Sequence, residues 1–148
     1  MKKTFVCSLM ALVTLLGCEK KKTPSTDFNG KQSQVIINMI AAVNEKDAQK
    51  YVNGFAEGVE VFVEYEKKVD GKSALKANRA EHFKNHPNVR SEIQHLVEID
   101  NKVILHDKVW LNNADTIGSD IVEIFTFENG KVIRVDVIQP KDLFGNSE

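Results

Sequence analysis

The chain has 148 residues, of which 42% are hydrophobic and 28% are charged, and its formal net charge is −1. These values are typical of a folded protein with one domain of ordinary size. They argue against a nucleic-acid-binding protein, which needs a surplus of Lys and Arg on its surface.

The N-terminus has the pattern of a bacterial export signal. Lys2 and Lys3 precede an apolar run over residues 5–16, which is too short to span a bilayer. The sequence LLGC at residues 15–18 resembles the bacterial lipobox, in which a signal peptidase cuts before a cysteine that then carries lipid. We therefore expect Cys18 to be lipidated (palmitate-bearing) and to anchor the mature protein to a membrane of the cell envelope. The alternatives are an ordinary secretory signal and an uncleaved anchor.

Lipidation would leave the mature protein without a free thiol. Cys7 lies in the removed signal peptide and Cys18 would carry lipid, so a structural disulfide and a catalytic thiol are both excluded. Glu19 stands where an aspartate would resemble the inner-membrane retention signal of enteric-type bacteria, which favours the outer membrane. The expected segments are a signal peptide (1–17), a flexible tether (18–31), a domain (32–140) and a tail (141–148).

The domain opens with helical patterns and closes with strands. Apolar residues recur at helical spacing near the start of the domain, and later segments alternate as strands do. The expected helices span residues 35–43, 48–54 (N-cap Asp47) and 74–85 (N-cap Ser73). The expected strands span residues 59–65, 92–99, 103–111 and the two arms of a hairpin over 121–138. This order predicts an α+β fold with three N-terminal helices packed on a curved antiparallel sheet.

Asn129 and Gly130 predict a type I′ turn in the closing hairpin. A regular two-residue turn would place Glu123 opposite Asp136, and side chains would alternate between two faces. The predicted apolar face carries Val122, Ile124, Thr126, Ile133, Val135 and Val137, and the other carries Glu123, Phe125, Phe127, Val132, Arg134 and Asp136. Either face can be the inner one.

Five short stretches together resemble the SnoaL-like branch of the nuclear-transport-factor-2-like (NTF2-like) superfamily. They are AVNEKD at 42–47, YVNGFAEGVEV at 51–61, GKSAL at 71–75, VILHDKV at 103–109 and ENGKV at 128–132. The resemblance implies a cone-shaped fold that is shared by ketosteroid isomerases, polyketide cyclases, scytalone dehydratases and non-enzymatic domains. It says little about activity, because this fold carries many functions.

The resemblance also suggests residues for a site inside the cone. The catalytic base of ketosteroid isomerases falls on Val63, which cannot abstract a proton, whereas their oxyanion-stabilising acid falls on Glu123. The missing base argues against an enzyme with the family mechanism. We expect Glu123 and Asp136 to be the catalytic candidates if there is any catalysis. The expected ligand pocket consists of Phe55, Val63, Tyr65, His106, Trp110, Phe125 and Arg134.

Metal and cofactor chemistry have little support in the sequence. His82 and His86 have i, i+4 spacing, but no third ligand follows from the pattern, so we expect neither a metal nor a cofactor. His106 and Asp107 are strand neighbours that point to opposite faces, which argues against a catalytic dyad.

Three functional hypotheses follow. The first is a cell-envelope lipoprotein with a non-catalytic module that binds a small apolar ligand or a protein partner. The second is an enzyme of isomerase, cyclase or dehydratase type that uses Glu123. The third is a structural lipoprotein that assembles through the predicted apolar hairpin face, for example as a homodimer through Val122, Ile124, Ile133, Val135 and Val137.

Overall fold

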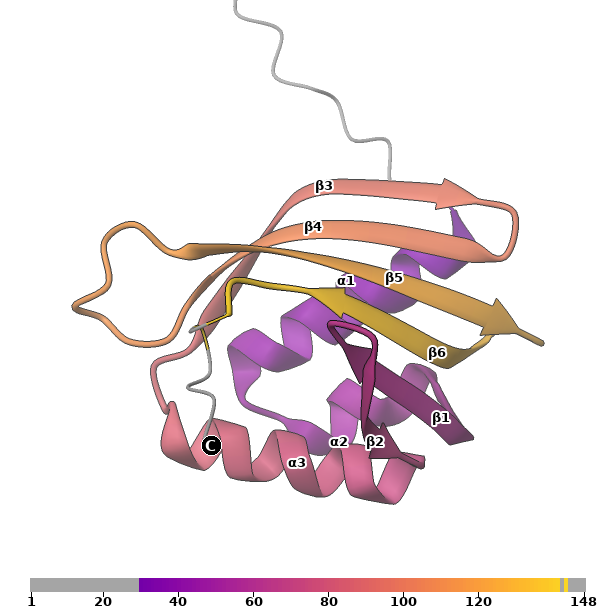
Figure 1. Ribbon diagram of the computed structural model, residues 1–148, viewed down its shortest axis with the longest axis horizontal. Coiled ribbons are helices and arrows are strands. Elements are labelled where there is room, and N and C mark those ends of the chain that lie inside the picture. Colours follow the sequence, from indigo (N-terminus) through magenta and orange to yellow (C-terminus); the bar gives the residue numbers. More distant parts are fainter. Residues whose placement is uncertain (1–29, 142, 144–148) are drawn as a thin grey trace, which may run out of the picture.

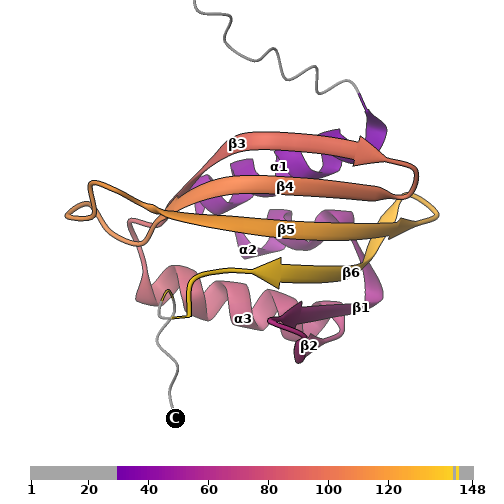
Figure 2. The ribbon, with the colours of Figure 1, turned by 45° about the horizontal axis from the view of Figure 1, so that its top comes forward.

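The computed structural model describes residues 30–141 and 143, so the expected signal peptide, Cys18 and nearly all of the tether lie outside the described residues. It has a curved six-stranded sheet with the helices on one side (Figures 1 and 2). The helical elements are α1 (Lys31–Glu45), α2 (Ala48–Tyr51), the 3-10 turn η1 (Val52–Gly54) and α3 (Lys72–Asn85). The strands are β1 (Phe55–Val63), β2 (Glu66–Asp70), β3 (Arg90–Ile99), β4 (Lys102–Trp110), β5 (Ser119–Glu128) and β6 (Lys131–Ile138).

The expected α+β fold is confirmed. The strand order is β2-β1-β6-β5-β4-β3, and every neighbouring pair is antiparallel except β1 and β6, which are parallel. The core lies between α1 and the inner face of the sheet, where Ile36 packs with Phe55, Leu105 and Phe125. Within residues 30–141 and 143, no helix has the length and apolar character needed to cross a membrane.

The first two helices follow the sequence pattern closely. The Asp47 carboxylate accepts a hydrogen bond from the Lys50 backbone N–H at 2.9 Å, which confirms it as the N-cap of α2. The prediction for Ser73 was wrong. Helix α3 begins at Lys72, and Gly71, with a φ of 92°, takes the capping position because it tolerates this backbone angle.

The first strand ends earlier than predicted and turns into β2, which the sequence pattern did not reveal. Glu64 and Tyr65 have φ angles of 49° and 71°, so they form the turn between β1 and β2. Tyr65 therefore does not share the inner face with Val63, and 94% of its surface is exposed. Its predicted place in the pocket is wrong, because the reversal of the chain carries it out of the sheet.

The closing hairpin has the predicted turn but not the predicted register. Asn129 and Gly130 have φ angles of 50° and 75°, as a type I′ turn requires. Phe127 pairs with Val132, but the next pair is Thr126 with Arg134, so Ile133 is an extra residue on β6. This β-bulge shifts every later pair by one residue.

The shifted register overturns the predicted Glu123–Asp136 pair. Glu123 lies opposite Val137, and Asp136 lies opposite Ile124. Asp136 points outward and pairs with Arg134 at 2.6 Å and 2.8 Å. The bulge keeps both charges at the surface, where they avoid the cost of burial.

The two faces of the hairpin change accordingly. Val135 is buried in the core, and Val137 faces the interior beside it, so neither belongs to an outer apolar face. The remaining outer residues of that set are Val122, Ile124 and Ile133. A homodimer through this reduced face stays a prediction.

Helix α1 is capped by a residue far away in the chain. Gly30 precedes α1 and has no side chain to cap it, but Glu98 on β3 accepts hydrogen bonds from Ser33 N–H at 2.8 Å and Ser33 Oγ at 2.7 Å. These bonds lower the pKa of Glu98 against the opposing effect of burial. A Cβ atom at Gly30 would lie 1.8 Å from a Glu98 oxygen, so glycine there leaves room for the cap.

We expect Glu98→Gln to lower the free energy of unfolding at pH 7 by about 1 kcal/mol, the usual value of a helix cap. The pKa of Glu98 is lowered on folding, so its contribution is complete above its unfolded value of 4.5 and is lost as the pH falls through its folded value. Urea unfolding at pH 7 and pH 3 measures this. Glu92→Gln on the same strand is the control. An equal loss of stability in both variants would contradict the capping role.

Candidate functional site

A cavity of about 560 Å³ lies between the helices and the inner face of the sheet. All three α-helices and all six strands contribute residues to its lining. Its sheet side is mainly aliphatic, with Val61, Val63 and Val135, whereas helix α3 lines it with polar side chains that include Asn78, Arg79 and His82. This combination of size and lining is typical of a small-molecule site.

Two carboxyl groups face this cavity from neighbouring strands. Asp107 is on β4 opposite Ile121, and Glu123 is on β5 opposite Leu105. The two acids are therefore diagonal neighbours on the inner face of one antiparallel pair, close enough for long side chains to interact. Asp107 is only 3% exposed, whereas Glu123 exposes part of its surface to the cavity.

The enclosure of both acids changes their protonation. Burial raises the pKa of Glu123 to about 8, the charge of Asp107 adds to this effect, and Arg79 opposes it. Burial also raises the pKa of Asp107, against the hydrogen bond from Ser91. Like charges in a shared low-dielectric site favour one proton between them, so at neutral pH Glu123 is a protonated acid.

Asp107 is held in place through a chain of contacts from helix α1. Asn44 on α1 binds the backbone of Ser91, donating to its carbonyl at 2.9 Å and accepting from its N–H at 2.8 Å. The Ser91 hydroxyl donates to Oδ2 of Asp107. The other oxygen, Oδ1, is buried and has no hydrogen-bond partner among the described residues.

Helix α3 brings basic and imidazole groups to the cavity. His82 and His86 have ring centroids 4.8 Å apart, and burial lowers the pKa of His82 to about 4, helped by Arg79 and His86. His82 is therefore neutral at pH 7. Within residues 30–141 and 143, no three His, Cys, Asp or Glu side chains gather where they can hold a metal ion.

Tyr51 on α2 forms part of the same lining. Its ring stacks on Phe55 at 5.5 Å between centroids, and the Arg79 guanidinium lies 5.6 Å from its centre. Burial raises the pKa of Tyr51 to about 12, Arg79 opposes this shift, and the acids Glu123 and Asp107 add to it. The hydroxyl is thus neutral in the physiological range.

The structure brings only part of the predicted site together. Val63 and Glu123 line the cavity. Phe55 and Phe125 lie in the packed core beside it. Arg134 is exposed and lies 3.8 Å from the centre of the Phe62 ring, so its predicted place in the pocket is wrong, for the same reason as for Asp136.

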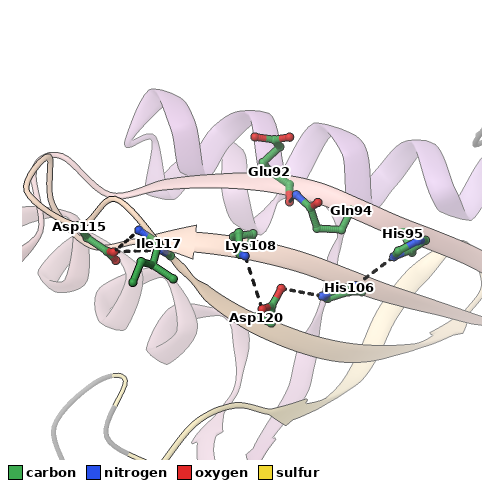
Figure 3. A network of polar contacts seen from close by, with 9 residues as sticks. Glu92, Gln94, His95, His106, Lys108, Asp115, Ile117 and Asp120 are labelled. Atoms are coloured by element: carbon green, nitrogen blue, oxygen red, sulfur yellow. Dashed lines mark hydrogen bonds and ion pairs between the residues drawn. The ribbon is translucent and has the colours of Figure 1, made fainter. Parts of the chain in front are cut away.

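His106 and Trp110 point away from the cavity, so their predicted places in the pocket are also wrong. Figure 3 shows His106 between His95 and Asp120, with contacts of 3.0 Å to His95 Nδ1 and 3.0 Å to Asp120 Oδ1. Trp110 lies under the Arg90 guanidinium at 3.5 Å. Both residues alternate with Asp107 along β4, which confirms that His106 and Asp107 cannot act together.

Asp107 and Ser91 were missed as site residues. The sequence did contain an indication for Asp107, because strand alternation puts it on the same face of β4 as the buried residues Val103, Leu105 and Val109. An acid in that position of an otherwise apolar face is unusual unless it has a partner or a role. Ser91 carries no comparable signal, since small polar residues are common on any strand.

Comparisons with known proteins agree with this architecture. Residues 36–135 match the family of the SnoaL-like domain. No curated protein sequence is detectably similar to the chain. Among solved structures, an NTF2-like protein of unknown function from Cytophaga hutchinsonii has a TM-score of 0.62 at 12% identity, covering 74% of this chain and 89% of that one.

Two further similar structures carry names that suggest activities for those proteins. AclR, a candidate hydroxylase from Streptomyces galilaeus, has a TM-score of 0.64 at 15% identity, covering 74% of this chain and 89% of its own. A candidate polyketide cyclase from Sinorhizobium meliloti has a TM-score of 0.60 at 16% identity, covering 70% and 93%. At these identities the likeness establishes the fold alone.

The raised pKa of Glu123 predicts a pH dependence of stability. Because the folded state keeps this proton up to about pH 8 and the unfolded state loses it near 4.5, stability falls as the pH rises between these values. The slope is at most about 1.4 kcal/mol per pH unit. We expect Glu123→Gln to remove this slope in thermal unfolding between pH 5 and pH 9, whereas the exposed Glu128→Gln keeps it. A wild-type slope that survives in Glu123→Gln would refute the assignment.

Proposed function

We propose that this chain, which belongs to the SnoaL-like domain family, uses its internal cavity to bind a small, mostly apolar molecule. The observation that carries this proposal is the cavity of about 560 Å³, whose sheet side is mainly aliphatic and whose α3 side is polar. Val63 lines this space. The resemblance to ketosteroid isomerases puts their catalytic base at this position, where valine cannot abstract a proton. Binding without the family reaction fits these residues best.

A second candidate function is acid–base catalysis in the same cavity. The observation that favours it is the raised pKa of Glu123, which makes this residue a proton donor near neutral pH beside a second carboxyl group. Such a donor is suited to polarise a carbonyl oxygen of a ligand. The candidate hydroxylase and cyclase names of two similar structures are compatible with this chemistry.

We further propose that the domain works at a membrane of the bacterial cell envelope, with the outer membrane favoured. The support is the LLGC sequence at residues 15–18 and the glutamate at position 19. A lipid on Cys18 and the polar segment up to residue 31 would hold the cavity close to the bilayer. An apolar ligand would then have only a short distance to travel between membrane and cavity.

The cavity proposal predicts that bulk at Val63 prevents binding. N-phenyl-1-naphthylamine, an uncharged apolar fluorophore, is titrated into the purified full-length chain. We expect Val63→Trp to weaken its binding at least about tenfold, because the indole occupies the space that the ligand needs.

Val97→Trp is the matched control, because Val97 is 47% exposed on the sheet. Binding to any other apolar part of the chain would be the same in both variants. Equal affinities in Val63→Trp and Val97→Trp, or no binding to the wild type, would overturn the cavity proposal.

The anchor proposal predicts that lipid incorporation depends on one residue. In bacteria grown with an alkyne-labelled palmitate, we expect the wild-type chain to take up the label and to fractionate with membranes. Cys18→Ser is expected to lose the label, whereas Cys7→Ser is expected to keep it. Label in Cys18→Ser would rule out this anchor.

A further inference from the structure

We infer that the cavity recognises a hydroxyl group on its apolar ligand, which donates a hydrogen bond to Asp107 and accepts one from Glu123. This inference rests on the proposed binding function and adds the polar group that the ligand carries. Among the described residues, Asp107 on β4 and Glu123 on β5 are the acidic side chains on the inner face of the sheet that line the cavity.

Asp107 is oriented by the protein but only half satisfied by it. The Ser91 hydroxyl binds Oδ2, and Asn44 fixes Ser91 through two backbone hydrogen bonds. Oδ1 is buried without a partner among residues 30–141 and 143, on a residue that is 3% exposed. A buried acceptor without a donor is costly, and a ligand hydroxyl that reaches Asp107 from the cavity would supply the missing donor.

Glu123 complements Asp107 from the next strand. Its carboxyl group faces the cavity and makes no hydrogen bond to another described residue. Because its pKa is raised to about 8, it carries a proton at pH 7 and can donate it in a hydrogen bond. The pair therefore presents one donor and one acceptor toward the same space.

The spacing of the two acids suits a single bridging atom. Asp107 and Glu123 are diagonal neighbours across the β4–β5 pair, and such residues lie roughly 7–8 Å apart along the sheet. No direct hydrogen bond joins their carboxyl groups in the described part of the chain. An oxygen atom between them is within reach of both side chains.

A hydroxyl is the simplest neutral group that meets both requirements. A ketone or ether oxygen only accepts, so it would leave Asp107 unsatisfied. An ammonium only donates, and a carboxylate would be repelled by the charge of Asp107. The aliphatic residues on the sheet side of the cavity favour an apolar remainder of the ligand. We therefore expect an apolar alcohol or a phenol.

The test compares two probes of nearly equal size, 2-naphthol and 2-methylnaphthalene, in equilibrium dialysis at pH 6 against the full-length protein. The measured quantity is the ratio of their dissociation constants in the wild type, in Asp107→Asn and in Asp120→Asn. The amide side chain introduced by Asp107→Asn keeps an oxygen for the Ser91 hydroxyl but removes the charged acceptor. Asp120 is an exposed acid on the other face of β5, so its variant is the matched control.

We expect the preference for 2-naphthol to be about tenfold greater in the wild type and Asp120→Asn than in Asp107→Asn, as befits one hydrogen bond to a charged group. The same preference in all three proteins would overturn the hydroxyl assignment but leave the cavity proposal intact. Failure of both probes to bind the wild type would overturn the cavity proposal and this inference with it. If Asp107→Asn does not fold, as judged by circular dichroism, Glu123→Met replaces it, because a methionine side chain of similar size cannot donate a hydrogen bond to the ligand oxygen and is expected to reduce the preference as well.

Discussion

The extra residue Ile133 on β6 determines what the interior of this protein contains. Val132 and Val135 both face inward although they are three positions apart, which strict alternation forbids and a bulge permits. The same shift moves Arg134 and Asp136 to the outer face, where they pair with each other. Without the bulge, three charged residues of the hairpin would lie on one face, and that face cannot be buried at reasonable cost.

The cavity follows from an uneven division of packing between the helices. Helix α1 buries five residues against the sheet, and Ile36, Met39 and Ile40 fill the space on its side of the core. Helix α3 buries only Leu75 and Phe83, so its otherwise polar surface covers the sheet without filling the space beneath it. An unfilled space lowers the stability of the folded state. The buried apolar cluster around Phe55 and Phe125 offsets this cost.

Two acids remain inside because both lie on the inner face of the sheet, toward the cavity that the helices cover. Asp107 alternates with buried aliphatic residues on β4, and Glu123 lies two positions before the buried Phe125 on β5. Among the described residues, neither acid forms a salt bridge with a basic side chain, and the opposing charge that acts on Glu123 is that of Arg79. A proton on Glu123, rather than a salt bridge, therefore relieves the repulsion between the two carboxyl groups. Near pH 7 this leaves Glu123 as a hydrogen-bond donor beside Asp107 as an acceptor.

The sequence by itself determined the fold class and part of the local structure. The helical spacing of residues 35–43, the cap at Asp47 and the Asn129-Gly130 turn are short-range features, and each appears in the structure as predicted. Only the tertiary structure decided the register of β6, the turn at Glu64 and Tyr65, and the diagonal placement of Asp107 and Glu123 on β4 and β5. The physical reason is that a β-bulge costs little energy locally. Its position depends on which face of the whole sheet is buried, and a short stretch of sequence does not contain this information. The four wrongly placed pocket residues, Tyr65, His106, Trp110 and Arg134, and the wrongly paired Asp136 lie in segments where such long-range choices set the direction of the side chains.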